Sequence, residues 1–232
     1  MLADFFNHDF FNVGMFRPFV GDNDTLFFII CGIVLTIIPY LLGSINFAII
    51  ISGRRFHDDV REHGSGNAGM TNMLRTYGKR AAGLTLLGDA LKAVLAAIVG
   101  YYMMGMYGAY IAGFFCVLGH TFPIFHKFKG GKGVVTTAAS MLMCNPIVFL
   151  IILALFVTIV AIWRFISLGS IMCALLYPFI LSGVDMVLLG HPSGLYIIFA
   201  LLTSVLVIVK HKDNIKRLLE GKENKLSFKK QS

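Results

Sequence analysis

The chain has 232 residues, of which 57% are hydrophobic and only 14% charged, with a formal net charge of +8 and a mean hydropathy of +0.78. Soluble globular domains carry about 25% charged residues, so this composition excludes an ordinary soluble protein and predicts an integral membrane protein. The 4 cysteines stand singly within apolar stretches, which is typical of small buried side chains and excludes a paired zinc or redox motif.

Residues 1–24 form a Phe-rich N-terminal extension to which we assign no function. Its charged residues are mostly aspartates, and it lacks a basic start before a short apolar run, so no signal peptide is predicted. Its phenylalanines favour a position at the membrane interface. The rest divides into a membrane domain, residues 25–212, and a cytoplasmic C-terminal segment, residues 213–232.

Long apolar stretches without strict alternation predict an all-α polytopic protein rather than a barrel. Pro146 predicts a break between two of the helices. The helix before it is only about 12 residues long, or ~18 Å, which is too short to cross an ordinary bilayer and suggests a half-helix. Seven helices are expected, at about 26–51, 81–102, 107–119, 134–145, 146–163, 165–182 and 195–209.

The basic residues are unevenly distributed along the chain. All but Arg17 and Lys92 of the 20 Lys and Arg residues fall in 52–80, in 120–133, at Arg164 or in 210–232. With seven crossings and the N-terminus outside, these segments share one face, and the positive-inside bias predicts that this face is cytoplasmic. An arrangement with five crossings keeps the same sidedness, with the C-terminus inside.

The first polar segment, 58-DDVREHGSGNAGMTNMLRTYGKR-80, suits an anion. Glycines allow tight turns that bring backbone N–H groups inward, and short neutral side chains surround two arginines. The alternative is a glycine-rich turn whose basic residues only set topology. The candidate ligands are Arg61, Ser65, Asn67, Thr71, Asn72 and Arg75.

The second polar segment, 119-GHTFPIFHKFKGGKGVVTT-137, has the chemistry of a phosphate loop. Gly130, Gly131 and Gly133 leave room for an oxyanion at the backbone, Lys132 supplies a mobile charge with Lys129 as a further candidate, and an apolar helix follows. It does not match a Walker loop, which requires a glycine at position 126 and Ser or Thr at position 133. A nucleotide hydrolase is therefore excluded.

The third polar segment, 210-KHKDNIKRLLEGKENK-225, places His211, Asn214 and Arg217 near one face of a short helix that Gly221 ends. The alternative is a basic helix attracted to anionic lipid. Two smaller features are Asp89 and Lys92, one helical turn apart, which favour a structural ion pair, and Ser167 beside Arg164 at a helix junction, which could join the same site.

Together these segments resemble the bacterial acyl-phosphate-dependent glycerol-3-phosphate acyltransferases, the PlsY-type family, over roughly residues 40–225. The resemblance rests on 43-GS-44, on 59-DVREHGSGNAGMTN-72 followed by Arg75, on 119-GHTFP-123, on 128-FKGGKGV-134 and on 211-HKDNIKRLLEGKE-223. Met70, Val135 and Ala139 stand where the family usually has Ala, Ala and Gly, and none of them is a polar site residue.

The resemblance implies a multi-pass enzyme of the bacterial inner membrane with its active site near the cytoplasmic face. It would transfer a fatty acyl group from acyl phosphate to the 1-hydroxyl of glycerol 3-phosphate, giving lysophosphatidic acid and phosphate. We expect no cofactor, and no metal because carboxylates are scarce in the three polar segments. The positions it implies to be essential are Ser65, Arg75, Lys132, His211 and Asn214. We add as phosphate ligands Arg61, Asn67, Thr71, Asn72, Gly130, Gly131, Gly133 and Arg217, and as further possible members Ser44, Lys129 and Ser167.

Two questions stay open at this point. The base is either His211 or a phosphate oxygen of glycerol 3-phosphate, and the family favours the second. The main rival function is a transporter of an anionic solute, although a carrier places its polar residues near the bilayer midplane; a lipid-binding scaffold leaves the glycine loops unexplained. The expected partners are both substrates, membrane lipid and functional coupling to the soluble enzyme that makes acyl phosphate, without nucleic acid.

Overall fold

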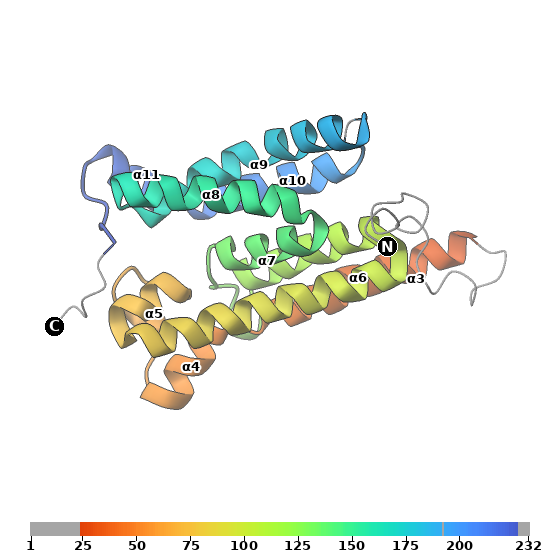
Figure 1. Ribbon diagram of the computed structural model, residues 1–232. Coiled ribbons are helices and arrows are strands. Elements are labelled where there is room, and N and C mark those ends of the chain that lie inside the picture. Colours follow the sequence, from red (N-terminus) through yellow and green to blue (C-terminus); the bar gives the residue numbers. More distant parts are fainter. Residues whose placement is uncertain (1–23, 192, 227–232) are drawn as a thin grey trace.

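The structure, a computed structural model, describes residues 24–191 and 193–226, and all its regular elements in those ranges are helical (Figure 1). The extension predicted for residues 1–24 therefore lies, apart from Asp24, outside the described residues. The elements are α3 (Asp24–Ser44), α4 (Phe47–Phe56), η2 (Val60–Glu62), α5 (Met70–Tyr77), α6 (Lys79–Thr121), η3 (Ile124–His126), α7 (Val134–Cys144), α8 (Pro146–Trp163), α9 (Ile166–Leu189), α10 (Tyr196–Lys210) and α11 (Lys212–Leu219).

Four helical runs are long and apolar enough to cross a membrane: Ile29–Phe56, Lys79–His126, Pro146–Trp163 and Ile166–Leu189. Shorter apolar helices are Val134–Cys144 and Tyr196–Lys210. Large apolar side chains on these helices are exposed, such as Phe179 at 69% and Val187 at 82%. Lipid rather than water is the solvent in which such a surface is stable, so this is a multi-pass integral membrane protein.

The single helix expected over 26–51 is wrong, because the chain breaks at Ile45 and Asn46. The Asn46 side chain accepts a hydrogen bond from the Ile49 N–H and so starts α4. Two carbonyls at the break, those of Gly43 and Ile45, accept from the ammonium of Lys92 over 2.9 and 2.7 Å. The break is therefore stabilised by a residue on another helix.

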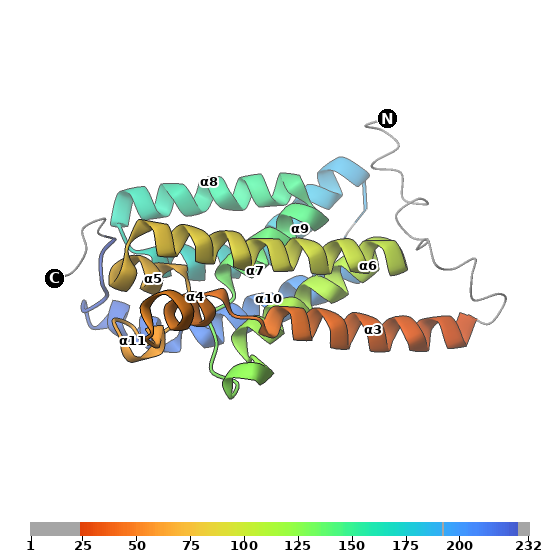
Figure 2. The same cartoon turned by 90° about the horizontal axis from the view of Figure 1, so that it is seen from below.

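The run labelled α6 consists of two arms, as the separate predictions for 81–102 and 107–119 require. Met104 and Gly105 are not helical, and Gly105 has a φ of +59°, which glycine adopts without strain. A Cβ added to Gly100 would overlap the carbonyl of Gly108, and the reverse also holds. The chain therefore turns back at Met104 and Gly105 (Figure 2). The two arms touch at Gly100 and Gly108, which have no side chains to keep the backbones apart.

The later helices agree with the sequence analysis, apart from one end. α7 is the short helix predicted, and Asn145 caps α8 with Pro146 in its first turn. α9 continues to Leu189, beyond the predicted end at 182, although Pro178 lies inside it. α11 ends at Leu219 just before Gly221, whose φ is +68°, as predicted.

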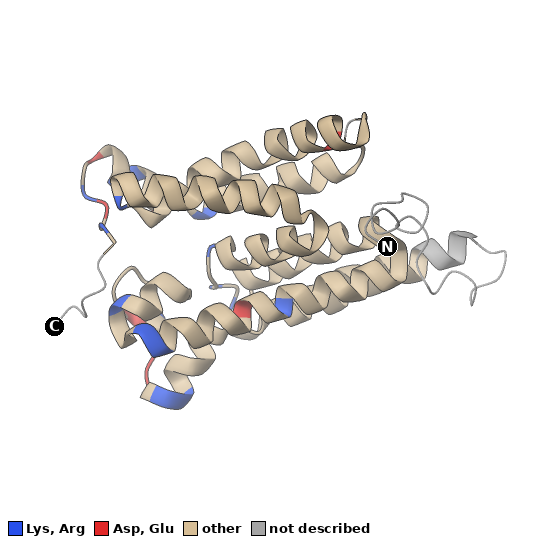
Figure 3. Cartoon of the chain, in the orientation of Figure 1, with Lys and Arg blue, Asp and Glu red and all other residues tan. Residues whose placement is uncertain are grey.

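Figure 1 shows α3 to α7 on one side and α8 to α11 on the other. Charged residues gather mainly at one end, where α4, α5 and α11 lie (Figure 3). The described parts of the three polar segments thus meet at the end of the molecule that carries most of the charge.

Candidate active site

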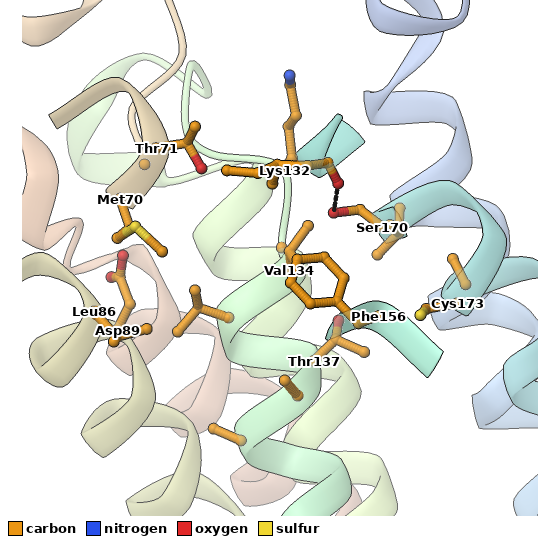
Figure 4. Close-up of a pocket in the computed structure, with 18 of the residues that line it drawn as sticks. Met70, Thr71, Leu86, Asp89, Lys132, Val134, Thr137, Phe156, Ser170 and Cys173 are labelled. Atoms are coloured by element: carbon orange, nitrogen blue, oxygen red, sulfur yellow. Dashed lines mark hydrogen bonds between the residues drawn. The ribbon is translucent and has the colours of Figure 1, made fainter. Parts of the chain in front are cut away.

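A cavity of about 610 Å³ is lined by residues of both helix groups (Figure 4). Lys132 lies at one end of this view, and Val134, Thr137, Phe156 and Cys173 lie toward the other. Further apolar lining residues are Leu86, Leu142, Phe149, Ile152, Leu153 and Tyr177. The cavity therefore joins a polar end to an apolar interior, which suits a molecule with an anionic head and an aliphatic tail.

The residues predicted to be catalytic all line this one cavity: Ser65, Arg75, Lys132, His211 and Asn214. So do some of the predicted ligands, namely Asn67, Thr71, Asn72, Gly133 and Ser167. The remaining candidates lie outside the lining: Ser44, Arg61, Lys129, Gly130, Gly131 and Arg217.

Lys132, Asn214 and Glu223 form one hydrogen-bonded chain at the polar end. Nζ of Lys132 donates to Oδ1 of Asn214, and Nδ2 of Asn214 donates to Oε1 of Glu223 over 2.9 Å. Glu223 also accepts from Oγ of Ser167 over 3.0 Å and from Nε of Arg217 over 2.8 Å. Burial alone would raise the pKa of Glu223, but these three donors outweigh it and lower that pKa. The ionised Glu223 thus fixes the Asn214 amide with its oxygen toward Lys132.

Lys132 and Arg75 make this end a site for an anion. Burial, followed by the charges of Arg217 and Arg75, lowers the pKa of Lys132 to about 8. Burial also lowers the pKa of Arg75, with the charge of Arg217 acting in the same direction, although a guanidinium stays protonated in proteins. Partly buried cations that repel one another gain most from an anion placed among them.

His211, where α10 meets α11, is buried and neutral. Its Nδ1 donates to the Val207 carbonyl over 2.7 Å, because a carbonyl oxygen can only accept. Nε2 therefore carries the lone pair. Burial lowers the pKa of His211 to about 4, against the opposing effect of the Val207 bond and with a further lowering by Lys132. The ring is a hydrogen-bond acceptor at neutral pH but a weak base.

Asn72 shapes the first loop rather than presenting a free amide. Its Nδ2 donates to the carbonyls of Val60 and His63, each over 2.9 Å, and its Oδ1 accepts from the Ser65 N–H over 2.9 Å. Gly64, with a φ of +57°, lies against this amide, where a Cβ would overlap Oδ1. Asn72 thereby places Ser65 at the cavity, and its own proposed contact with phosphate remains a prediction.

Arg61 connects the first and second loops. Its guanidinium pairs with Asp59 over 2.6 Å and also donates to the carbonyls of His126 and Lys129 over 3.2 and 3.4 Å. The Asp59 hydrogen bond raises the pKa of Arg61 despite some burial. The structure thus gives Arg61 a role in holding the loops together.

The glycines of the second loop fit against the end of α6. The Gly131 N–H donates to the His120 carbonyl over 3.1 Å. A Cβ on Gly130 would overlap that carbonyl, and one on Gly131 would overlap Nε2 of His120. We predicted that these glycines leave space for an anion, whereas the space they leave on the Cβ side is filled by protein. Gly133, with a φ of +81°, turns the chain into α7.

Glu223 and His120 belong to this site but were not among the predicted residues, although they lie in the segments 211–223 and 119–123 that carry the family resemblance. Glu223 is the only carboxylate at the end of the third motif that is buried, at 9% exposure, and sequence gives no sign of that burial. His120 is 4% exposed and lines the cavity. An isolated histidine at a helix end carries little signal by itself.

Known proteins are similar in sequence to this chain over most of its length. The glycerol-3-phosphate acyltransferase family matches residues 33–221. A glycerol-3-phosphate acyltransferase of Clostridioides difficile (strain 630) is 40% identical over 205 residues, covering 86% of this chain and 97% of the relative. One of Thermoanaerobacter sp. (strain X514) is 42% identical over 200 residues, covering 85% and 96%.

A solved structure gives the same result. The crystal structure of PlsY, an integral membrane glycerol 3-phosphate acyltransferase, in its glycerol 3-phosphate form has a TM-score of 0.75 at 33% identity, covering 84% of this chain and 95% of that one. The lysophosphatidic acid form has a TM-score of 0.72 at 32% identity. Since the sequence match includes the second polar segment and most of the third, and the helices superimpose, this chain belongs to the PlsY family of glycerol-3-phosphate acyltransferases.

Proposed function

We propose that this protein transfers a fatty acyl group from acyl phosphate to the 1-hydroxyl of glycerol 3-phosphate, giving lysophosphatidic acid and phosphate. This is the first acylation step of phospholipid synthesis. The main evidence is a cavity of about 610 Å³ whose polar end is lined by the five predicted catalytic residues and whose interior is apolar. These residues are Ser65, Arg75, Lys132, His211 and Asn214. Solved relatives in glycerol 3-phosphate and lysophosphatidic acid forms support it.

The polar end binds the phosphates of both substrates. Lys132 and Arg75 supply positive charge, Asn67 and Thr71 supply neutral donors at the lining, and Gly133 leads into the N-terminus of α7, whose dipole favours an anion. The acyl chain extends among the apolar side chains between α7 and α9. Binding both substrates in one cavity aligns the hydroxyl with the acyl carbonyl, which lowers the entropic part of the barrier.

The reaction requires little covalent chemistry from the protein. The hydroxyl oxygen of glycerol 3-phosphate attacks the acyl carbonyl carbon, the bond from that carbon to the phosphate oxygen breaks, and inorganic phosphate leaves with the bonding electrons. The hydroxyl proton passes to a phosphate oxygen of glycerol 3-phosphate. His211, with a pKa of about 4, is a weaker base than a phosphate dianion, whose conjugate acid has a pKa of about 6. We assign His211 the role of accepting a hydrogen bond that orients substrate.

The chain crosses the inner membrane seven times, in this proposal, with the N-terminus outside and the C-terminus in the cytoplasm. The concentration of charge at the α4, α5 and α11 end supports this orientation (Figure 3). A cytoplasmic site receives water-soluble glycerol 3-phosphate directly. It receives the acyl donor, acyl phosphate, from the soluble enzyme that makes it. A transporter is less well supported, since the candidate ligands lie toward one end of the bundle.

The test is a direct assay. Detergent-purified protein is given acyl phosphate and labelled glycerol 3-phosphate, and the lipids are extracted. Labelled lysophosphatidic acid and stoichiometric phosphate release are expected. The control is Lys132→Met, which removes the charge from the site and should reduce the rate by at least about 100-fold. Equal product with and without acyl phosphate would refute the donor assignment.

A further inference from the structure

Asp89, Lys92 and His120 form a buried polar cluster outside the chain of Lys132, Asn214 and Glu223. Their exposed fractions are 1%, 2% and 4%. Asp89 and Lys92 lie on the first arm of α6, and His120 lies at the end of the second. Ionisable groups at such depth are costly to bury and are kept where they bind or position something.

Lys92 is the centre of the cluster. Its ammonium lies 2.9 Å from the Gly43 carbonyl, 2.7 Å from the Ile45 carbonyl, 2.8 Å from Oδ1 of Asp89 and 3.0 Å from Nδ1 of His120. An ammonium has three hydrogens: two satisfy the carbonyls and the third points to Nδ1 of His120, while Asp89 pairs with Lys92 by charge alone. His120 can accept at Nδ1 only in the neutral form that carries its proton at Nε2.

The other edge of the His120 ring, which in that tautomer carries the proton at Nε2, faces the second loop. Nε2 occupies the space that a Cβ on Gly131 would need, and the His120 carbonyl accepts the Gly131 N–H over 3.1 Å. The next residue along the loop is Lys132. The ring of His120 therefore stands between the buried ammonium of Lys92 and the backbone that carries the cationic side chain of the site.

The first loop reaches the same point. The Ala68 carbonyl is the next protein atom, after Nε2 of His120, that a Cβ on Gly131 would meet, and it accepts a hydrogen bond from Nδ2 of Asn46 over 3.3 Å. Asn46 belongs to the helix break whose carbonyls Lys92 holds. The second glycine loop thus contacts the cluster directly through His120, and the first contacts it indirectly, through Asn46 at the helix break that Lys92 holds.

We propose that His120 is a positioning residue of the acyltransfer site, that Lys92 and Asp89 hold its ring, and that the ring sets where the backbone at Gly131, and hence Lys132, lies. This inference rests on the proposed function, because its kinetic effect is measured as the KM for glycerol 3-phosphate.

His120→Asn separates the two contacts of the ring. Asparagine keeps an acceptor near the position of Nδ1, so Lys92 stays bonded, but lacks the ring edge that meets Gly131. The expected result is a KM for glycerol 3-phosphate raised about tenfold with kcat within about threefold of the parent. Hydrogen exchange of the amides in 129–133 should be about tenfold faster. A second variant, Asp89→Asn with Lys92→Met, removes both charges together and should raise the same KM.

Val148→Ala is the control, since Val148 on α8 is fully buried in a hydrophobic core and is not a lining residue of the cavity. It should lower the melting temperature while leaving KM and loop exchange at the parent values. The inference is overturned if both cluster variants keep the parent KM and loop exchange, or if Val148→Ala raises KM equally. Should the parent itself lack acyltransferase activity, the proposed function fails. Hydrogen exchange of residues 129–133 in the variants and the parent then tests by itself whether His120 positions the loop.

Discussion

The ammonium of Lys132 donates a hydrogen bond to the side-chain oxygen of Asn214, although the two residues are 82 positions apart. This bond joins the loop before α7 to α11, and therefore the second polar segment to the third. Its direction depends on Glu223, which accepts a hydrogen bond from the amide nitrogen of Asn214 and leaves the amide oxygen for Lys132.

Glu223→Gln should lower kcat/KM for glycerol 3-phosphate by about tenfold or more. Glutamine has one acceptor oxygen in place of two, so it cannot serve Ser167, Asn214 and Arg217 together. Steady-state kinetics measure the effect. Glu220→Gln is the matched control, because it removes the same charge three residues away from an exposed side chain that contacts Lys222 over 3.2 Å. Equal losses in both variants would contradict the role of Glu223.

The affinity for glycerol 3-phosphate should depend on the ionisation of Lys132. Since its pKa is lowered to about 8, Lys132 is a cation below that pH and increasingly neutral above it. Above about pH 6, where the phosphate of glycerol 3-phosphate is a dianion, the KM should be flat up to about pH 7 and rise above about pH 8. The kcat should also fall as the pH rises, but the fall should begin at a higher pH than the rise in KM, because a bound anion raises the pKa of Lys132. Lys132→Arg keeps its charge throughout and should remove the rise in KM; persistence of the same rise would assign it to another group.

Gly131→Ala should raise the KM for glycerol 3-phosphate and lower the melting temperature. The added methyl group meets Nε2 of His120 and the Ala68 carbonyl, so the loop must move away from both. Gly183→Ala is the control, because beyond its own helix backbone and chain neighbours nothing lies within 4 Å of the added Cβ, and both quantities should stay near the parent values. A parent-like KM in Gly131→Ala would remove the loop from the phosphate site.

Acyl phosphate should be the only effective donor among acyl phosphate, acyl-CoA and acyl carrier protein. The cavity presents anion ligands next to an apolar interior, and the sequence has no motif for a nucleotide. Lipid product is compared for the three donors at equal concentration of the same acyl chain. Comparable turnover with acyl-CoA would show that this assignment is wrong.

Activity should persist in EDTA. Among residues 24–191 and 193–226, no group of three or more His, Cys, Asp or Glu side chains is arranged to hold a metal ion, and Lys132 with Arg75 supplies positive charge for the phosphates. The rate is measured with EDTA and then with added magnesium. A loss that magnesium alone restores would contradict the prediction.

Local signals in the sequence predicted much of the fold. Pro146 and Gly221 act within their own turns, so the start of α8 and the end of α11 followed directly. The break at Ile45 did not, because it depends on Lys92, which lies 47 positions further along the chain. Gly43, Ser44 and Asn46 surround Ile45, and Asn46 is a typical helix-capping residue, but these local features do not show that a buried ammonium satisfies the free carbonyls.

In the candidate site, too, some features could be predicted from local sequence and others depend on distant residues. Residue type and spacing led to Ser65, Arg75, Lys132, His211 and Asn214, all of which line one cavity. Pattern alone could not separate a residue that faces the cavity from one that builds its wall. Asn72 and Arg61 have the chemistry of anion ligands, yet their polar atoms bond to neighbouring loop groups.

The reversal at Met104 and Gly105 has a consequence for the order of assembly during synthesis. The close approach of Gly100 and Gly108 joins residues eight positions apart, so this hairpin can form as soon as its second arm enters the membrane. Contacts between neighbouring segments form early because they close short loops. The bond from Lys132 to Asn214 must wait until α8, α9 and α10 have been inserted and α11 has been made. The active site is therefore among the last parts of the molecule to be completed, after most of the membrane bundle is already in place.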